Sequence, residues 1–256
     1  MQVDLTKLTR AQKLELLQLL EAKRDLRQSR GYERYYPDDG PLRRELYPKH
    51  LEFFRAGRDY RERCAMAANR IGKTEGMGGY ETALHLTGDY PHWWQGRRFG
   101  HPVSWWAAGK SFESTRDIIQ AKLFGPITYR GAEKTVKGTG LIPRDRIGRI
   151  TWKSGVQDLI DTVEIKHDTG DWSVLGLKSY QQGRGGFEGT EKHGVWLDEE
   201  CPIEIYNECT IRTATTNGIV MLTFTPLEGA SETVLAFMPP DILNKEIERL
   251  KRAGEL

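Results

Sequence analysis

The chain has 256 residues, with 38 Lys and Arg against 36 Asp and Glu, a formal net charge of +2. This length suits one large α/β domain with a substantial core, and the small net charge excludes a protein that binds nucleic acid over its whole surface. Three cysteines without metal-ligand spacing argue against a disulfide framework. No apolar run is long enough to cross a membrane and the N-terminus lacks a signal peptide's apolar core, so we expect a soluble intracellular protein.

The first predicted element is an amphipathic helix of about 20 residues near the N-terminus. Residues 9–12, Thr-Arg-Ala-Gln, have the form of a capping box, and the leucines that follow recur at helical spacing. We expect this helix to pack on the domain, with binding to a partner as the alternative. Residues 31–48 are rich in turn-forming residues and predict a linker. Residues 1–45 are therefore assigned to an N-terminal helix and linker.

Residues 47–54 precede the first predicted strand, at the distance where many ATPases carry a motif that contacts adenine. An aromatic or aliphatic face can stack on the base while a polar side chain reads its edge. His50 is the candidate for the polar role. A histidine packed near the start of a helix is an equally good explanation of this residue.

Residues 63–74, Arg-Cys-Ala-Met-Ala-Ala-Asn-Arg-Ile-Gly-Lys-Thr, predict a strand, a phosphate-binding loop and the start of a helix. Lys73 would reach the β- and γ-phosphates of ATP, and the Thr74 hydroxyl would bind Mg²⁺. The helix, from Thr74 to about Leu86, would present its positive N-terminal end to the phosphates. The usual pattern begins with Gly where this chain has Ala67. The loop residues that would surround the phosphates are Ala67, Ala68, Asn69, Arg70, Ile71 and Gly72.

Further strands and helices follow in alternation. Val103–Ala108 predicts a strand and residues 111–123 a helix that Ser111 opens. Residues 163–167 and 172–179 predict two strands around a turn. This alternation predicts an α/β fold with a mainly parallel central sheet flanked by helices and a site at the carboxyl ends of its strands.

One segment, residues 130–153, carries seven basic side chains against Glu133 and Asp145. A DNA backbone would be attracted to such a segment through contacts that are sensitive to salt and independent of base sequence. A solvated loop surface is the alternative. The basic residues are Arg130, Lys134, Lys137, Arg144, Arg146, Arg149 and Lys153.

An apolar run at residues 194–200 ends in three carboxylates and predicts the second strand of a nucleotide site. Asp198, at the tip of the strand, would hold the Mg²⁺ shell, and Glu199 would polarise the attacking water. An ordinary acidic turn is the alternative, which the Gly-Lys-Thr sequence disfavours. The glycine-rich loop at residues 180–190 could present Arg184 to a nucleotide or serve only as a connection.

The last predicted core elements are a helix at residues 203–214 and an apolar strand from Gly218 to Thr225. A threonine at the end of that strand, Thr223 or Thr225, can hydrogen-bond the catalytic carboxylate or the attacking water and report the nucleotide state. Residues 241–256 predict a charged amphipathic helix.

Five segments together, residues 68–74, 87–98, 181–190, 196–200 and 223–226, resemble the large terminase subunit of tailed bacteriophages in their order. The phosphate loop of that family often lacks the first glycine. The resemblance implies a P-loop ATPase of the additional-strand, catalytic-glutamate type, with ATP and Mg²⁺ as cofactors. It also implies a motor that packages double-stranded DNA in the bacterial host cytoplasm, with the portal protein and the small terminase subunit as partners. Such a motor would be a homo-oligomeric ring, expected to be a pentamer, although the isolated chain could be a monomer.

The same resemblance assigns roles to the site residues. Lys73 and Thr74 would bind phosphate and Mg²⁺, Asp198 would be the metal-shell carboxylate, and Glu199 the catalytic base. Residues 223–226 would form the motif that couples hydrolysis to movement.

Family members also supply an arginine that stabilises the γ-phosphate, either from the phosphate loop or from a neighbouring subunit. Arg70 matches the first position and Arg184 is a candidate for the second, and the sequence does not choose between them. The ATPase core would span residues 46–230. Residues 231–256 would lead toward a nuclease domain, which we expect this chain to lack.

Two other functions stay open. A helicase-like ATPase acting on DNA or RNA would ordinarily need a second motor domain, for which 256 residues leave little room. A nucleotide-binding assembly scaffold would bind ATP without turnover. A small-molecule kinase fits less well, because a carboxylate pair at a strand end suits water activation.

Overall fold

A seven-stranded sheet forms the centre of the molecule, and in the computed structural model the described residues are 9–29, 31–131, 133–227, 229 and 231–253. The strand order is β1-β9-β8-β2-β7-β6-β5; the first five strands are parallel to one another, and β6 is antiparallel to both of its neighbours, β7 and β5. The mainly parallel α/β sheet is thus as predicted. In the order of the sheet, the strands are β1 (Glu62–Met66), β9 (Ile219–Phe224), β8 (Gly194–Asp198), β2 (Ser104–Gly109), β7 (Trp172–Ser179), β6 (Ile160–Lys166) and β5 (Ile147–Trp152).

Strand β9 lies between β1 and β8, so one strand separates the predicted phosphate-loop strand from the acidic strand. All residues of β8 and β9 are buried, as expected for parallel strands covered on both faces. Thr223 is aligned with Ala65 on one side and with Asp198 on the other. This register brings the carboxyl ends of all three strands to one edge and confirms the additional-strand prediction.

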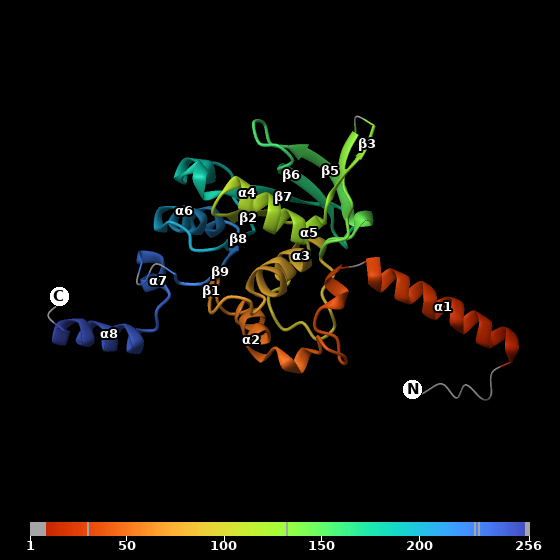
Figure 1. The fold of residues 1–256 in the computed structure, drawn as a ribbon, viewed down its shortest axis with the longest axis horizontal. Helices are drawn as coiled ribbons and strands as arrows, with labels where there is room; N and C mark the ends of the chain where they lie inside the picture. Colours follow the sequence, from red (N-terminus) through yellow and green to blue (C-terminus); the bar gives the residue numbers. More distant parts are fainter. Residues whose placement is uncertain (1–8, 30, 132, 228, 230, 254–256) are drawn as a thin grey trace.

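Helices cover both faces of the sheet (Figure 1). One core lies between the sheet and α2 (Pro48–Ala56), α3 (Tyr80–Thr87) and α5 (Ala121–Phe124), and the other lies under α6 (Ile203–Ala214) and α7 (Glu232–Ala236). Strand β8 contributes alternate residues to the two cores, because successive strand side chains point to opposite faces. The remaining helices and strands are α1 (Arg10–Ser29), α4 (Phe112–Ser114), α8 (Pro240–Ala253) and the hairpin β3 (Ile127–Arg130) and β4 (Glu133–Val136).

The helix after the phosphate loop begins as a π-helical segment, Lys73–Gly79, and continues as α3. Its extent agrees with the prediction, whereas the wider turn was not predicted. Gly78 lies against the buried indole of Trp196, and a Cβ there would be 2.1 Å from Trp196 Nε1. The absence of a side chain at residue 78 therefore lets the tryptophan occupy the space directly beneath the nucleotide helix.

The predicted capping box of α1 is present. The Thr9 N–H donates to Gln12 Oε1 at 3.0 Å, and the Gln12 N–H donates to Thr9 Oγ1 at 3.3 Å. The expectation that this helix packs on the domain is wrong for its described leucines, because α1 projects from the body (Figure 1) and four of them are more than half exposed. These are Leu14, Leu17, Leu19 and Leu20.

Residues 31–48 form turns as predicted, including two short 3₁₀ helices, Gly31–Arg34 and Arg44–Leu46. They also pack on the rest of the domain, because Tyr32 and Tyr36 are buried in the core on the α2 and α3 side of the sheet. Tyr36 contacts the rings of Phe54 and Tyr80 edge-on. The predicted division at residue 45 stays a prediction, but the stretch before it contributes buried aromatic rings to the core.

Most of the other predicted elements are present, and one prediction is corrected. The ranges of β7 and α6 match, and the predicted strand before residue 109 is β2. The basic segment at residues 130–153 is not a loop, because it contains β4 and β5. The predicted C-terminal helix is α8, and residues 254–256 lie outside the described residues. Among the helices described, none has the length and apolar character needed to span a membrane.

We expect Gly78→Ala to lower the free energy of unfolding by about 1–3 kcal/mol, because the added methyl group has no room beside Trp196. A helical Gly→Ala change ordinarily stabilises by up to about 1 kcal/mol. Chemical denaturation would measure the difference. Gly100→Ala is the control, because a Cβ there meets nothing within 4 Å; equal effects of the two substitutions would contradict the prediction.

Candidate active site

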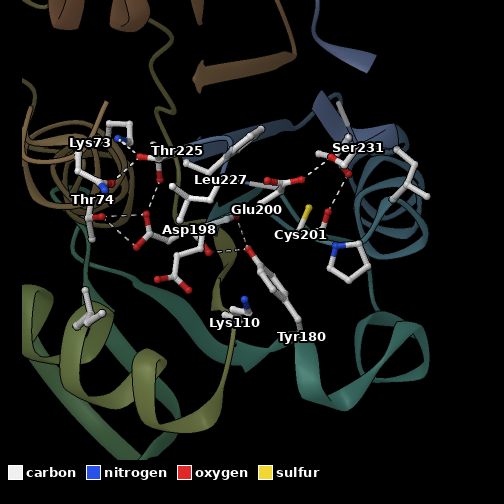
Figure 2. Close-up of a pocket in the computed structure, with 18 of the residues that line it drawn as sticks. Lys73, Thr74, Lys110, Tyr180, Asp198, Glu200, Cys201, Thr225, Leu227 and Ser231 are labelled. Atoms are coloured by element: carbon white, nitrogen blue, oxygen red, sulfur yellow. Dashed lines mark hydrogen bonds between the residues drawn. The ribbon is translucent and has the colours of Figure 1, made fainter. Parts of the chain in front are cut away.

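A cavity of about 840 Å³ opens at the carboxyl ends of β1, β9 and β8 (Figure 2). It lies where the fold class predicts a ligand site, at the edge on which parallel strands end. Most of the predicted site residues lie on its wall. They are Asn69, Arg70, Gly72, Lys73, Thr74, Asp198, Glu199, Thr223 and Thr225.

The phosphate loop, residues 67–72, joins β1 to the π-helical segment. Arg70 and Gly72 have left-handed backbone conformations, with φ of 65° and 85°. Alternation of left-handed and right-handed residues turns successive N–H groups toward one concave side, which suits an anion. Ala67 is not left-handed, and its N–H donates to the Phe224 carbonyl at 3.2 Å. A Cβ is compatible with this conformation, so glycine is not required where the usual pattern has it.

The Lys73 ammonium lies inside this loop. Its Nζ donates to the carbonyl oxygens of Ala67 at 2.7 Å and Ala68 at 2.6 Å and to Thr225 Oγ1 at 2.8 Å. Burial lowers the pKa of the lysine, and the negative charge of Asp198 partly opposes that shift. Three neutral acceptors therefore satisfy a cation that an anionic phosphate would satisfy better.

Asp198 is only 3% exposed and accepts hydrogen bonds from two threonines. Thr74 Oγ1 donates to its two carboxylate oxygens at 3.0 and 3.1 Å, and Thr223 Oγ1 donates to Oδ1 at 2.7 Å. Trp196 Nε1 in turn donates to Thr223 Oγ1 at 2.7 Å. Burial raises the pKa of Asp198 to about 7, although both threonine hydrogen bonds oppose the shift.

The Thr74 hydroxyl and the Asp198 carboxylate fit a magnesium ion. Mg²⁺ prefers oxygen ligands, keeps several waters and is usually held by one or two protein groups together with substrate phosphates. Among the residues described there is no cluster of three or more His, Cys, Asp or Glu that could hold a metal alone. A buried carboxylate whose pKa is raised by burial is a group that a bound cation would stabilise in its ionised form.

Glu199 follows Asp198 in a left-handed conformation, with φ of 66°. Its N–H donates to the Thr223 carbonyl at 2.9 Å, so the ladder between β8 and β9 extends through this turn. Tyr180 Oη donates to the Asp198 carbonyl at 2.8 Å (Figure 2). A non-glycine residue in this conformation costs free energy and persists only where surrounding contacts enforce it. The Glu199 side chain lines the cavity.

His50 does not line the main cavity but a second one, of about 680 Å³, which shares Arg70 and Gly72 of the phosphate loop with the first. Its Nδ1 is 2.7 Å from Tyr36 Oη and its Nε2 is 2.9 Å from the Ile71 carbonyl. Burial lowers the pKa of this histidine. The ring therefore supports the loop at Ile71, and the adenine contact stays a prediction that would require one of these two bonds to be replaced.

The two candidate arginines are separated. Arg70 lines both cavities from the phosphate loop. Arg184 lies on a 3₁₀ turn, Arg184–Phe187, and lines neither cavity. Its Nε donates to Glu208 Oε2 on α6 at 3.0 Å. The fold thus brings Arg70 to the site of its own chain and keeps Arg184 outside it.

Lys110 and Tyr180 are among the residues that line the cavity although sequence patterns did not single them out. Lys110 follows β2, whose carboxyl end lies at the same edge as the other strand ends. Its position directly after a predicted strand could have identified Lys110 as a site residue. Tyr180 follows β7, and its bond to the Asp198 carbonyl depends on the strand order, which local patterns do not contain.

The basic segment is partly neutralised by carboxylates from other parts of the chain. Lys134 pairs with Asp158 at 2.6 Å, and Lys153 pairs with Asp161 at 3.0 Å. Arg146 lies 3.5 Å from Asp89. The exposed members include Arg144 and Arg149. DNA contact by this segment therefore stays a prediction that rests on fewer free charges than the sequence suggested.

The topology and the cavity define the class of protein. A mainly parallel sheet with one strand inserted between the phosphate-loop strand and the acidic strand, and a Lys-Thr pair facing a buried Asp, is the arrangement of an additional-strand P-loop NTPase. A family model described as "Terminase large subunit, T4likevirus-type, N-terminal" matches residues 64–252. The chain belongs to this family.

A relative from the curated proteins agrees with this assignment. The chain is 37% identical over 253 residues to the large terminase subunit of Salmonella phage P22, and the match covers 91% of this chain and 48% of that protein. The chain thus spans about half the length of that relative.

Two solved structures are similar at 15% identity. The large terminase of a thermophilic bacteriophage, in complex with ADP, has a TM-score of 0.42 over 69% of this chain and 37% of its own. A mutant of the Thermus phage P74-26 large terminase ATPase domain has a TM-score of 0.39 over 74% of this chain and 71% of its own.

The raised pKa of Asp198 predicts the pH dependence of stability in the nucleotide-free and metal-free protein. Between about pH 4 and about pH 7 the unfolded chain loses this proton before the folded chain does, so the group makes stability fall as pH rises. Asp198→Asn does not titrate and retains partners for both threonines. We expect its melting temperature to exceed that of the wild type by a margin that grows from about pH 5 to about pH 8. A margin that is constant or shrinks over this range would contradict the prediction.

Proposed function

We propose that this chain is the ATP-hydrolysing motor domain of a phage terminase large subunit that drives double-stranded DNA into a procapsid. The observation that carries the proposal is the meeting of Lys73, Thr74, Asp198 and Glu199 at one cavity on the sheet order of this NTPase class. Membership of the terminase family supports the packaging role. A helicase-like ATPase and a scaffold without turnover are the alternatives.

In this proposal the phosphate loop binds ATP. The N–H groups of residues 68–72 would surround the phosphates, and Lys73 would exchange its bonds to the loop carbonyls for phosphate oxygens. Thr74 and Asp198 would hold Mg²⁺, which when bound neutralises charge on the β- and γ-phosphates. The adenine would lie on the His50 side of the loop, where the second cavity has aromatic walls.

Hydrolysis would use Glu199 as the base. Its carboxylate would take a proton from a water positioned in line with the γ-phosphate, while Asp198 stays engaged with Thr74 and Thr223. Arg70 would stabilise the developing negative charge from within the loop, and Arg184 would do so from a neighbouring subunit. The two carboxylates thus have different roles because one is buried and hydrogen-bonded and the other lines the open cavity.

Coupling would run through the end of β9. Thr223 donates to Asp198, and two residues later Thr225 accepts from Lys73 and donates to Asn69 Oδ1 at 2.7 Å. A change at the metal or at the γ-phosphate would therefore alter bonds at both threonines. The chain continues from them toward α7, which can carry the change out of the site.

The proposed partners follow from the family. They are double-stranded DNA, the portal protein, the small terminase subunit and further copies of this chain in a ring, in the cytoplasm of a bacterial host. Lys137, Arg144 and Arg149 are exposed members of the basic segment and could meet a DNA backbone. Their affinity for DNA would decrease with salt for all sequences alike.

Steady-state ATP hydrolysis with and without double-stranded DNA tests the function. A motor should hydrolyse ATP and be stimulated by the duplex. A scaffold would bind ATP and show no turnover under either condition. Stimulation by single-stranded DNA or RNA in place of the duplex would favour the helicase-like alternative.

Glu199→Gln should bind ATP and Mg²⁺ normally and lose about 10²–10⁴-fold in turnover, because the carboxamide keeps the shape but cannot accept the proton. Lys73→Ala is the matched contrast. It should weaken nucleotide binding itself by about 10- to 100-fold, since it removes a charged hydrogen-bond donor to the phosphates. Turnover of Glu199→Gln within a few-fold of wild type would remove Glu199 from this role.

The two arginines can be separated by mixing variants. If Arg184 acts on a neighbour, Arg184→Ala should reduce turnover by about 10³-fold or more in the assembled protein. Mixing it with Glu199→Gln should restore activity, because an intact Arg184 then faces an intact Glu199. Mixing Arg70→Ala with Glu199→Gln should restore none, since both residues would serve one pocket. Recovery in the Arg70 mixture alone would reverse the assignment.

A further inference from the structure

Glu208, on α6, is a buried carboxylate that contacts two arginines. It is 1% exposed. Arg184 Nε lies 3.0 Å from Oε2, and Arg212 Nη2 lies 2.8 Å from Oε1. An ionised carboxylate is seldom this buried without paired charges, so these two contacts account for its presence in the interior.

The same three residues hold the glycine-rich loop onto α6. Arg184 lies near the middle of the loop, and Arg212 Nη1 donates to the carbonyl of Gly189, near its end, at 2.8 Å. Phe187 of the loop is also fully buried in the core under α6, and Gly183 and Gly189 take left-handed conformations, with φ of 61° and 112°, that glycine adopts readily. Glu208 is the residue common to both attachments.

The way Glu208 binds Arg184 leaves the guanidinium able to act elsewhere. The contacts of Arg184 with Glu208 and with Glu188, at 3.0 and 3.7 Å, are both made at Nε. The side chain is 59% exposed. A guanidinium fixed at Nε can still direct its two terminal nitrogens at a phosphate, the forked geometry that makes arginine suited to this ligand.

The position of Glu208 on α6 shows where Arg184 is held relative to the active-site cavity. Glu204, one helical turn earlier, lines the active-site cavity of the same chain, whereas Arg184 lines neither that cavity nor the one beside His50. The pair is therefore near the site but outside it. Because its side chain is 59% exposed, Arg184 is accessible to a second copy of this chain.

We propose that Glu208 is a positioning residue that orients Arg184 toward the nucleotide of a neighbouring copy of this chain. The inference rests on the proposed function, in which Arg184 acts on a neighbour. Its prediction is that Glu208 affects hydrolysis through Arg184 and without contacting the nucleotide.

The test is ATP hydrolysis by Glu208→Gln. It is measured at protein concentrations where the specific activity of the wild type rises with concentration, because subunits then act on one another. We expect turnover to fall by about 10- to 10²-fold, because a loss of orientation of this kind is costly, while the KM for ATP stays near wild type. Glu188→Gln is the control, since that carboxylate is 55% exposed and 3.7 Å from the same nitrogen. It should stay within about twofold of wild type.

Recovery of hydrolysis in mixed assemblies distinguishes positioning from a merely structural role, because a subunit that is only misfolded would not recover activity. Glu208→Gln subunits mixed with Glu199→Gln subunits should recover activity, because an intact pocket then faces a correctly held Arg184. The double variant Glu208→Gln with Arg184→Ala should be no slower than Arg184→Ala alone. Should Glu208→Gln fold poorly by thermal unfolding, Glu208→Asp keeps the charge with a shorter reach and should give a smaller loss.

The outcomes separate the two hypotheses. Normal hydrolysis by assembled Arg184→Ala would remove Arg184 from its proposed role. Impaired Arg184→Ala with near-normal Glu208→Gln, or no recovery in the mixture, would overturn the positioning role alone. Faster hydrolysis by Glu208→Gln would also overturn it, because Glu208 would then restrain Arg184.

Discussion

The bond between Thr74 and Asp198 joins the two halves of the site, and the elements around it are arranged to keep it. Thr74 begins the helix that follows the phosphate loop, and Asp198 ends the acidic strand, 124 residues later. Thr223, from the strand between them, donates to the same carboxylate and receives the indole N–H of Trp196. The site is thus held by hydrogen bonds that link three neighbouring elements, the nucleotide-loop helix, β8 and β9.

This network explains features of the fold that look unrelated in the sequence. Trp196 can donate to Thr223 only if its indole lies beneath the nucleotide helix, and Gly78 provides the space. Burial also has an electrostatic consequence, because the site that shields Asp198 from water raises its pKa to about 7. A free energy cost is therefore present before any ligand binds, and a cation beside Thr74 would relieve it.

Local patterns predicted the parts of the site that lie on one element. Lys73 and Thr74 follow an apolar run, Asp198 and Glu199 end another, and the capping box at Thr9 needs only four residues. The features that were predicted wrongly or not at all depend on contacts between segments that are distant in the sequence. Nothing near α1 in sequence says whether a partner surface exists for its leucines, and the π-helical start of the nucleotide helix packs on a tryptophan from a strand that is distant in the sequence.

The distribution of surface charge was the property predicted least well from the sequence, because a count of charged residues does not show which of them form ion pairs. Residues 130–153 read as a strongly basic segment, yet Lys134 and Lys153 are each paired with an aspartate that follows the segment. Glu208 is the opposite case: an acidic residue within a predicted helix, unremarked by any motif, that holds two arginines from the interior. In both cases the fold decides which charges face solvent. Arg184 shows what a count of charges leaves out: its side chain is exposed, yet it is held at Nε by a buried carboxylate, so its terminal guanidinium nitrogens face outward from a fixed point.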